Sequence, residues 1–255
     1  FALGGPAVEA KQDEFHSLAK GVLDQYIDLM GGIPNPPPER KFRKSVVIIN
    51  AGKELDGEVI GNHISMILDP DGDPQNNMIG KFIFAHEFFH LWNGKTINVA
   101  TTKEDWFKEG VTNYYTIKTL RRIGAITDED YLGLLSGFFY GRYNADPGVG
   151  KLSMRDVASG TDKDKHWGLI YGGGMFVAMC QDINIREATG NKKSLDDVVR
   201  HYYRSLGGTG KTYTTDDMKA SISTISGSDQ TDFFRRFVYG VERVPIEGCL
   251  SQAGF

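Results

Sequence analysis

The chain has 255 residues, of which 40% are hydrophobic and 24% charged, a composition typical of a soluble globular protein with a sizeable core. The net charge of −4 and the pI near 5.9 give no reason to expect nucleic acid or an anionic membrane as a partner. No apolar run approaches transmembrane length and no signal peptide is recognisable, so we expect no membrane insertion. The sequence leaves the compartment and the oligomeric state open.

The first third of the chain predicts one helix and two strands. Residues 8–30 carry apolar side chains at helical spacing, which indicates an amphipathic helix. The β-branched run 45–50 predicts a buried strand, and 62–68 predicts a second strand. The polar, glycine-containing stretch 51–61 is expected to connect them. Residues 69–74 hold three aspartates, but their prolines and the missing downstream glutamate favour a solvated turn over a calcium loop.

From Gln75 onward the chain is expected to be helical. Asn76 or Asn77 is expected to cap a first helix, Thr101 to cap a second and Thr127 a third. Because strands come early and helices late, we predict an α+β fold with the sheet segregated near the N-terminus.

The second half of the chain predicts a loop-rich segment followed by capped helices. Residues 140–167 are rich in turn residues, and Gly172 to Gly174 are expected to open an apolar helix over 175–188. Further helices are expected after three capping positions, namely Ser194, Thr214 or Thr215, and Ser228.

The chain contains two cysteines, Cys180 and Cys249, which are too few for a disulfide framework. Cys180 lies in the apolar run 175–180, and this context favours a small core side chain.

The chemistry of the chain is concentrated in the pentapeptide His86-Glu87-Phe88-Phe89-His90. Two histidines at this spacing share one face of a helix, so both imidazoles can reach a single metal ion. The glutamate between them can reach a water on that metal, as in the HExxH zinc-peptidase signature. A core helix whose histidines pair with backbone or carboxylates is the alternative, but burying these three groups on one turn is costly.

A third ligand is expected from Glu109, which follows His90 after eighteen intervening residues in a second helical stretch. His86, His90 and Glu109 would hold one zinc ion and leave a fourth position for water, whose pKa the metal lowers towards 7. Glu87 faces the site without ligating it, so we expect it to act as general base and later to protonate the departing amine.

A neutral donor is also expected to share the charge of the attacked carbonyl oxygen. Five tyrosines are candidates, and packing roles are the alternative for each of them: Tyr114, Tyr115, Tyr140, Tyr143 and Tyr171. The other four histidines have no partner at metal-binding spacing and are not expected to be ligands: His16, His63, His166 and His201.

The blocks HEFFHLWN and WFKEGVTNYY resemble the glycyl aminopeptidase family of zinc metallopeptidases, relatives of the alanyl aminopeptidases with the same HExxH and glutamate spacing. The resemblance extends over nearly the whole chain through weaker landmarks such as Tyr171-Gly172-Gly173-Gly174. It implies a thermolysin-like zincin catalytic domain, expected at 1–125, followed by an all-α helical domain at 126–255. It also implies that Tyr171 stabilises the oxyanion. The β-rich N-terminal domain and the PDZ domain of the family are not recognisable in this chain.

One feature departs from the family pattern. Aminopeptidases of this group carry a glutamate on a glycine-rich strand that binds the free amine of the substrate, and the aligned position here holds Asn62. Glu58 would replace it only after a shift in register. Despite this departure, the ligand set and the general base predict a zinc-dependent metallopeptidase that acts on peptides, with an aminopeptidase as the leading hypothesis. An endopeptidase, or a zinc-binding peptide-recognition scaffold without turnover, remains the alternative.

Overall fold

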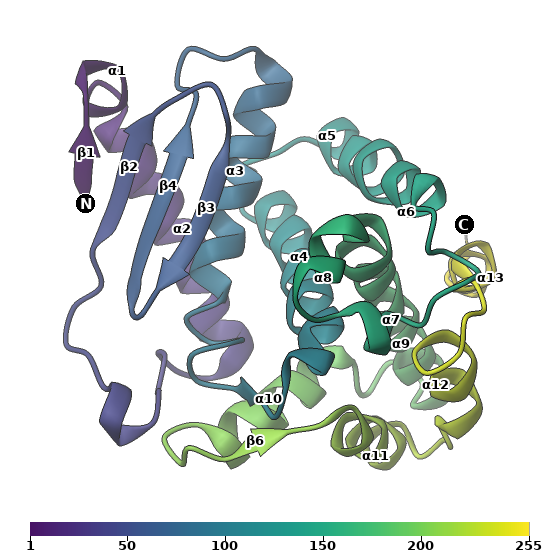
Figure 1. Cartoon of the computed structure of the whole chain (residues 1–255). Helices are drawn as coiled ribbons and strands as arrows, with labels where there is room; N and C mark the ends of the chain where they lie inside the picture. Colours follow the sequence, from purple (N-terminus) through teal and green to yellow (C-terminus); the bar gives the residue numbers. More distant parts are fainter. Residues whose placement is uncertain (255) are drawn as a thin grey trace.

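The computed structural model of the protein describes residues 1–254. A small sheet lies in the N-terminal part, two long helices cover one of its faces, and shorter helices make up the rest (Figure 1). The predicted mixture of an early sheet and late helices is therefore confirmed. Among residues 1–254, no helix has both the length and the apolar character that crossing a bilayer requires.

The sheet contains four strands in the order β1-β2-β4-β3. Their bounds are β1 Ala2–Gly4, β2 Val47–Ala51, β3 Asp56–Ile60 and β4 His63–Leu68. Strand β2 is parallel to both of its neighbours, whereas β3 pairs antiparallel with β4 and forms the sheet edge. Both predicted strands are present, but the expected connection at 51–61 contains β3. This strand was missed because its sequence, Asp-Gly-Glu-Val-Ile, is poor in strand-forming residues.

Helices α2 (Gln12–Met30) and α3 (Pro74–Phe89) cover one face of the sheet (Figure 1). The buried side chains of β2 and β4 belong to the same hydrophobic core cluster as Phe84 and Phe88 of α3. A short helix α1 (Pro6–Glu9) precedes α2. Helix α3 begins one turn earlier than predicted, because Asp73 and not Asn76 or Asn77 is its cap: the Asp73 carboxylate accepts from the Asn76 backbone N–H at 2.8 Å.

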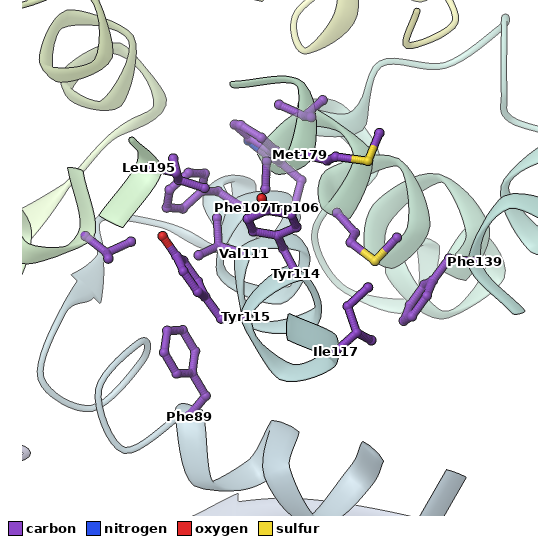
Figure 2. Packing of buried hydrophobic residues seen from close by; sticks show 14 of the residues in the cluster. Phe89, Trp106, Phe107, Val111, Tyr114, Tyr115, Ile117, Phe139, Met179 and Leu195 are labelled. Atoms are coloured by element: carbon purple, nitrogen blue, oxygen red, sulfur yellow. The ribbon is translucent and has the colours of Figure 1, made fainter. Parts of the chain in front are cut away.

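Helix α4 (Asp105–Arg122) is the centre of the helical part of the molecule. Thr101 forms the expected capping box with Glu104, but it caps the 3-10 turn Thr102–Glu104 that leads into α4, and α4 itself has no side-chain cap. Figure 2 shows the aromatic and aliphatic side chains of α4 packed among neighbours from several elements, including Phe89 of α3 and Met179 of α9 (Gly174–Ala188). Nearly every side chain of α4 between Asp105 and Leu120 is buried.

The remaining segments pack around α4 and complete the fold. The expected caps at Thr127, Ser194 and Thr214 are confirmed as capping boxes. The segment 140–167 is less loop-rich than predicted, since it contains three short helices. The remaining helices are α5 Asp128–Gly133, α6 Gly141–Ala145, α7 Met154–Val157, α8 Thr161–Lys165, α9 Gly174–Ala188, α10 Leu195–Leu206, α11 Thr215–Ser226, α12 Thr231–Phe237 and α13 Ile246–Gln252.

Two π-helical segments and several minor elements connect these helices. The π-helical turns are η3 (Leu134–Tyr140) and η4 (Gly168–Gly173). The minor elements are two 3-10 turns and a two-stranded ladder: η1 Pro38–Arg40, η2 Thr102–Glu104, β5 Asn98–Val99 and β6 Thr212–Tyr213.

The prediction that Gly172 to Gly174 begin a helix is wrong. Gly172 and Gly173 end η4 and Gly174 is the first residue of α9, so all three lie inside one continuous helical run. Their absent side chains serve close packing. A Cβ on Gly174 would lie 2.1 Å from the carbonyl oxygen of Trp106, and one on Gly110 would lie 2.2 Å from the carbonyl carbon of Gly174. Helices α4 and α9 therefore approach to backbone contact at this pair.

The prediction that Cys180 is a small core side chain is confirmed, but its pairing was not predicted. Cys180 is buried, but it forms a disulfide with Cys249, and the two Cα atoms lie 5.4 Å apart. The bond joins α9 to α13 across 69 residues of sequence. Counting two cysteines could not reveal it, because helix α13 was not predicted and the two positions are far apart along the chain.

Gly110→Ala should destabilise the fold, because its methyl group has no room against Gly174. Overpacking of this kind costs about 1–3 kcal/mol in the free energy of unfolding, measured by chemical denaturation. Gly133→Ala is the matched control. That glycine is helical and, apart from its own helix, no atom of residues 1–254 lies within 4 Å of the position that a Cβ would take. Because alanine favours helix over glycine, the control should be neutral or more stable by up to about 1 kcal/mol. Equal effects at the two sites would contradict the close contact.

The disulfide should be detectable by alkylation of the denatured protein and intact-mass measurement. We expect no reactive thiol before reduction and two after it. Cys180→Ala/Cys249→Ala should lower the free energy of unfolding by about 2–5 kcal/mol, because the bond restricts the unfolded chain. Two reactive thiols without reductant would contradict the pairing.

Candidate metal centre and cleft

The pentapeptide that carries the predicted chemistry forms the last turns of α3. These turns are buried, with His86 and Glu87 both less than 10% exposed. The helix starts at the sheet side, where Pro74 occupies its first turn without losing a needed N–H. Its buried end meets α4, so the histidines face the helix that holds Glu109.

The structure brings the three predicted ligands together. Glu109 Oε2 lies 3.4 Å from His86 Nε2 and 3.2 Å from His90 Nε2, and the two Nε2 atoms are 2.9 Å apart. One ligand atom from each residue lies within 4.8 Å of the others. Among residues 1–254, no other group of three such side chains is equally close.

The donor set fits a zinc ion. His90 Nδ1 lies 2.9 Å from the carbonyl oxygen of Asn93, which can only accept, so Nδ1 carries the proton and Nε2 presents its lone pair. Two nitrogen donors and one carboxylate oxygen then converge on one point, which is the His₂Glu set of catalytic zinc sites. His86 Nδ1 is buried and has no partner among residues 1–254.

Glu87 lies beside this group and does not join it. Its Oε1 is 4.0 Å from His86 Nε2. Burial raises the pKa of Glu87 to about 7; His86 opposes this effect, whereas Glu109, Asp56 and Glu58 reinforce it. A carboxyl group with a pKa near neutrality can both accept and return a proton.

Strand β3 crosses directly over Glu87. A Cβ on Gly57 would lie 2.8 Å from Glu87 Cγ and 2.6 Å from the Cγ2 atom of Ile83. Only a glycine lets the strand pass this close to Glu87. The edge of the sheet therefore forms one wall of the site.

Glu109 is surrounded by positive charge. Burial alone would raise its pKa, but His90, His86 and Lys163 outweigh burial and hold the pKa well below its ordinary range. The carboxylate is therefore ionised, as a metal ligand must be. One turn further along α4, Asn113 donates from Nδ2 to the carbonyl oxygen of Tyr171 at 3.1 Å, which ties the ligand helix to η4.

Tyr171 lies on the π-helical segment η4 and lines the cleft. Burial raises its pKa well above the ordinary value, and Glu109 adds to the effect, so the hydroxyl keeps its proton. The other four candidates lie outside the cleft lining, with their hydroxyls bound to the carboxylates of Asp182, Asp196 and Glu247 or to the Val244 backbone N–H: Tyr114, Tyr115, Tyr140 and Tyr143.

The cleft has a volume of about 830 Å³, within the range of ligand pockets. Opposite β3, its wall is aromatic. Trp167 stacks on Tyr171 with ring centroids 5.0 Å apart and contacts Phe138 at 5.4 Å. The Arg142 guanidinium lies over the Phe138 ring at 4.1 Å. Phe138 and Trp167 were not predicted to line the cleft, because no motif in the sequence marks either residue.

Asn62 does not line the cleft. It lies in the turn between β3 and β4, where its amide donates to the carbonyl oxygen of Lys44 at 2.6 Å. The cleft edge is formed instead by residues 55–59, which include the carboxylates of Asp56 and Glu58. The candidates for binding a substrate amine are therefore Asp56 and Glu58, and not Asn62.

The predicted non-ligand histidines lie outside the metal group. His166 Nδ1 is 2.9 Å from Asp146 Oδ1, and His63 Nδ1 accepts from the Val46 backbone N–H at 3.1 Å. Sequence reasoning missed Lys163, whose ammonium lies 2.9 Å from Glu109 Oε1. No motif marks this lysine, because it reaches the site from a segment that the sequence predicted as loop.

Comparison with known proteins places this site in context. The model of the M61 glycyl aminopeptidase family matches residues 81–205. No curated protein matches the chain.

Solved structures share the fold. An aminopeptidase N family protein from Idiomarina loihiensis superposes with a TM-score of 0.80 at 20% identity, over 94% of this chain and 44% of that one. An M1 zinc metallopeptidase from Deinococcus radiodurans gives 0.59 at 15% identity, over 88% and 44%. Yeast LTA4 hydrolase in complex with bestatin gives 0.59 at 15% identity, over 89% and 35%. The chain thus spans less than half the length of these proteins.

The fold is that of the M1 zincin aminopeptidase domains, and the matched segment contains His86, Glu87, His90, Glu109 and Tyr171. The resemblance predicted from the sequence is therefore confirmed, since residues 81–205 match the model of the M61 glycyl aminopeptidase family.

Proposed function

We propose that the chain is a zinc-dependent aminopeptidase in which His86, His90 and Glu109 hold one zinc ion. The observation that carries this proposal is the convergence of two Nε2 atoms and Glu109 Oε2 beside the raised-pKa carboxyl of Glu87. When bound there, zinc would lower the pKa of a coordinated water and polarise the scissile carbonyl.

The protein supplies the proton transfers and the oxyanion donor. Glu87 accepts a proton from the attacking water and passes it to the leaving amine. The Tyr171 hydroxyl, which burial keeps protonated, donates to the oxygen on which negative charge develops. The cleft between β3 and the aromatic wall limits the water around these groups.

The peptide is expected to pair with the edge of β3. Ile60 and His63 close the two-residue turn, so the main-chain groups of Gly57 and Val59 point away from β4. In agreement with this, the Lys95 ammonium donates to the Val59 carbonyl oxygen at 3.1 Å. The N–H and carbonyl of Gly57 are left facing the cleft, directly beside Glu87, where an extended peptide can add as a further strand.

Aminopeptidase rather than endopeptidase action is supported by the acidic character of this edge. Asp56 and Glu58 alternate with Gly57 along β3 and lie close enough to Glu87 to raise its pKa. A free α-amino group is a cation at neutral pH and is attracted to such a pair. The Deinococcus enzyme bound to a Tyr-Ser-Ala substrate shows that a relative of this fold takes a short peptide.

We also propose the domain division expected from the family, with a catalytic unit at 1–125 and a helical unit at 126–255. In support, the first part contains the sheet, both metal-ligand helices and the base, whereas the second supplies Tyr171, Trp167 and the rest of the aromatic wall. On this division, the substrate binds between the two units.

Glu87→Gln should retain zinc and lose turnover, because the amide keeps the shape of the base and cannot take the proton. We expect kcat on fluorogenic aminoacyl substrates to fall on the order of a hundredfold to ten-thousandfold. Glu54→Gln, an exposed glutamate outside the cleft lining, is the matched control and should act as wild type.

Zinc stoichiometry and the effect of a chelator complete this test. The proposal fails if the purified protein binds no stoichiometric zinc, or if Glu87→Gln hydrolyses peptides at the wild-type rate. Zinc binding without hydrolysis of free or blocked peptides would identify the scaffold alternative.

Asp56→Asn/Glu58→Gln should weaken the preference for a free amine. We expect kcat/KM on aminoacyl substrates to fall by about tenfold or more, as for a lost charged interaction, with little change on N-acetylated peptides. Asp71→Asn, an exposed aspartate in the turn before α3, is the control. Equal cleavage of blocked and free peptides by the wild type would show an endopeptidase instead.

A further inference from the structure

Lys163 brings a single ammonium group into the metal centre from outside the predicted catalytic motifs. It lies on α8, which closely precedes Trp167 and η4 in the chain. Its Nζ is 2.9 Å from Glu109 Oε1 and 3.0 Å from Asp105 Oδ2, and it lies 5.2 Å from the centroid of the Tyr171 ring. The lysine therefore contacts a ligand residue, a second carboxylate on α4 and the proposed oxyanion donor together.

The two oxygens of Glu109 have different surroundings because of this contact. Oε2 faces the Nε2 atoms of His86 and His90, at 3.4 and 3.2 Å. Oε1 is turned the other way, towards Lys163 at 2.9 Å and Lys108 at 3.4 Å. An ammonium bound to Oε1 keeps that oxygen from rotating onto a metal ion, so only one carboxylate oxygen is presented to it.

The surroundings of Lys163 favour this role over ordinary surface pairing. Its side chain is only 16% exposed, and Glu109 and Asp105 are still more buried. Buried carboxylates at such distances are costly unless cations offset them. No side chain of α8, which lies wholly in the described part of the chain, is fully buried, so apolar packing does not account for the position of this helix. The ion pairs of Lys163 are what join α8 to α4.

We propose that Lys163 is a positioning residue of the metal centre, which holds Glu109 as a one-oxygen ligand and keeps Tyr171 beside it. The proposal rests on the proposed function, since it takes His86, His90 and Glu109 as the zinc ligands. As a result, the coordination position of a bound zinc ion that no protein side chain fills would stay open for water. Removing the lysine frees Oε1 and leaves Glu109 and Asp105 with only Lys108 to offset them.

Lys163→Met tests the proposal through zinc affinity, which does not depend on turnover. The metal-free protein is titrated with zinc in competition with a chromophoric chelator. We expect affinity about ten- to a hundredfold weaker than wild type, the usual effect of losing a group that orients a ligand. Lys163→Arg, which keeps the charge, should recover most of it. Lys165→Met is the matched control on the same helix, because that lysine is exposed and pairs with Asp162, at 3.3 Å, away from the metal ligands.

The visible absorption of the cobalt-substituted protein provides a second readout. Its d–d bands respond to coordination number, so release of Glu109 Oε1 should change their intensity in Lys163→Met and not in Lys165→Met. A Lys163→Met protein with the affinity and spectrum of Lys165→Met would overturn the proposal. Absence of zinc binding by the wild type would instead refute the proposed function.

A folding defect in Lys163→Met is handled by a second variant. Asp105→Asn/Lys163→Met removes one negative and one positive charge, so the balance around Glu109 is kept. Zinc affinity weaker than that of Asp105→Asn alone supports the proposal, and equal affinity overturns it.

Discussion

The contact between Gly110 and Gly174 determines where the site residues lie. A Cβ on Gly110 would lie 2.2 Å from the carbonyl carbon of Gly174, so α4 and α9 meet backbone to backbone. Glu109 precedes Gly110 by one residue, and Tyr171 precedes Gly174 by three. This one close approach therefore fixes the positions of the proposed metal ligand on α4 and of the proposed oxyanion donor on η4. The disulfide between Cys180 and Cys249 acts further along α9, where it ties that helix to the end of the chain.

The buried charges at the end of α3 impose a second constraint. Glu87 and Glu109 are each less than 10% exposed, and a buried carboxylate costs several kcal/mol without compensation. The protein offsets them in two ways. Lys163 and Lys108 face the outer oxygen of Glu109, while the inner oxygen and both imidazoles are left to a cation. Glu87 is offset by neither lysine, and its raised pKa is the result.

The parts that local sequence determines were predictable. The HExxH spacing places both histidines on one helical face whatever surrounds them, and the capping boxes at Thr101, Ser194 and Thr214 each depend on residues three apart. Glu109 followed from a known spacing. Selection of Tyr171 among five tyrosines needed the family resemblance, because no local pattern distinguishes it. In the structure, the hydroxyls of the other four are hydrogen-bonded to groups outside the cleft lining.

The parts that depend on tertiary contact were not predictable from the sequence. Gly172 to Gly174 were interpreted as a helix start, since glycine usually interrupts helices, but here its absent side chain makes room for α4 and neighbouring helices. The π-helical turns η3 and η4 leave no periodic pattern in the sequence. Lys163 lies in a segment that the sequence predicts as loop. It reaches the site through an ion pair with Glu109, which is 54 positions away in the sequence.

The short free edge of β3 bears on the length of peptide that the cleft accepts. The strand has five residues, and only Gly57 and Val59 turn their main-chain groups towards the cleft. Lys95 already occupies the carbonyl of Val59, so the pairing surface beside Glu87 is reduced essentially to Gly57. An endopeptidase gains affinity from a peptide paired along several residues on both sides of the scissile bond. A site with so little edge must take more of its binding energy from the end of the substrate. On the proposed aminopeptidase function, this role falls to the carboxylates of Asp56 and Glu58, the neighbours of Gly57 in the cleft lining.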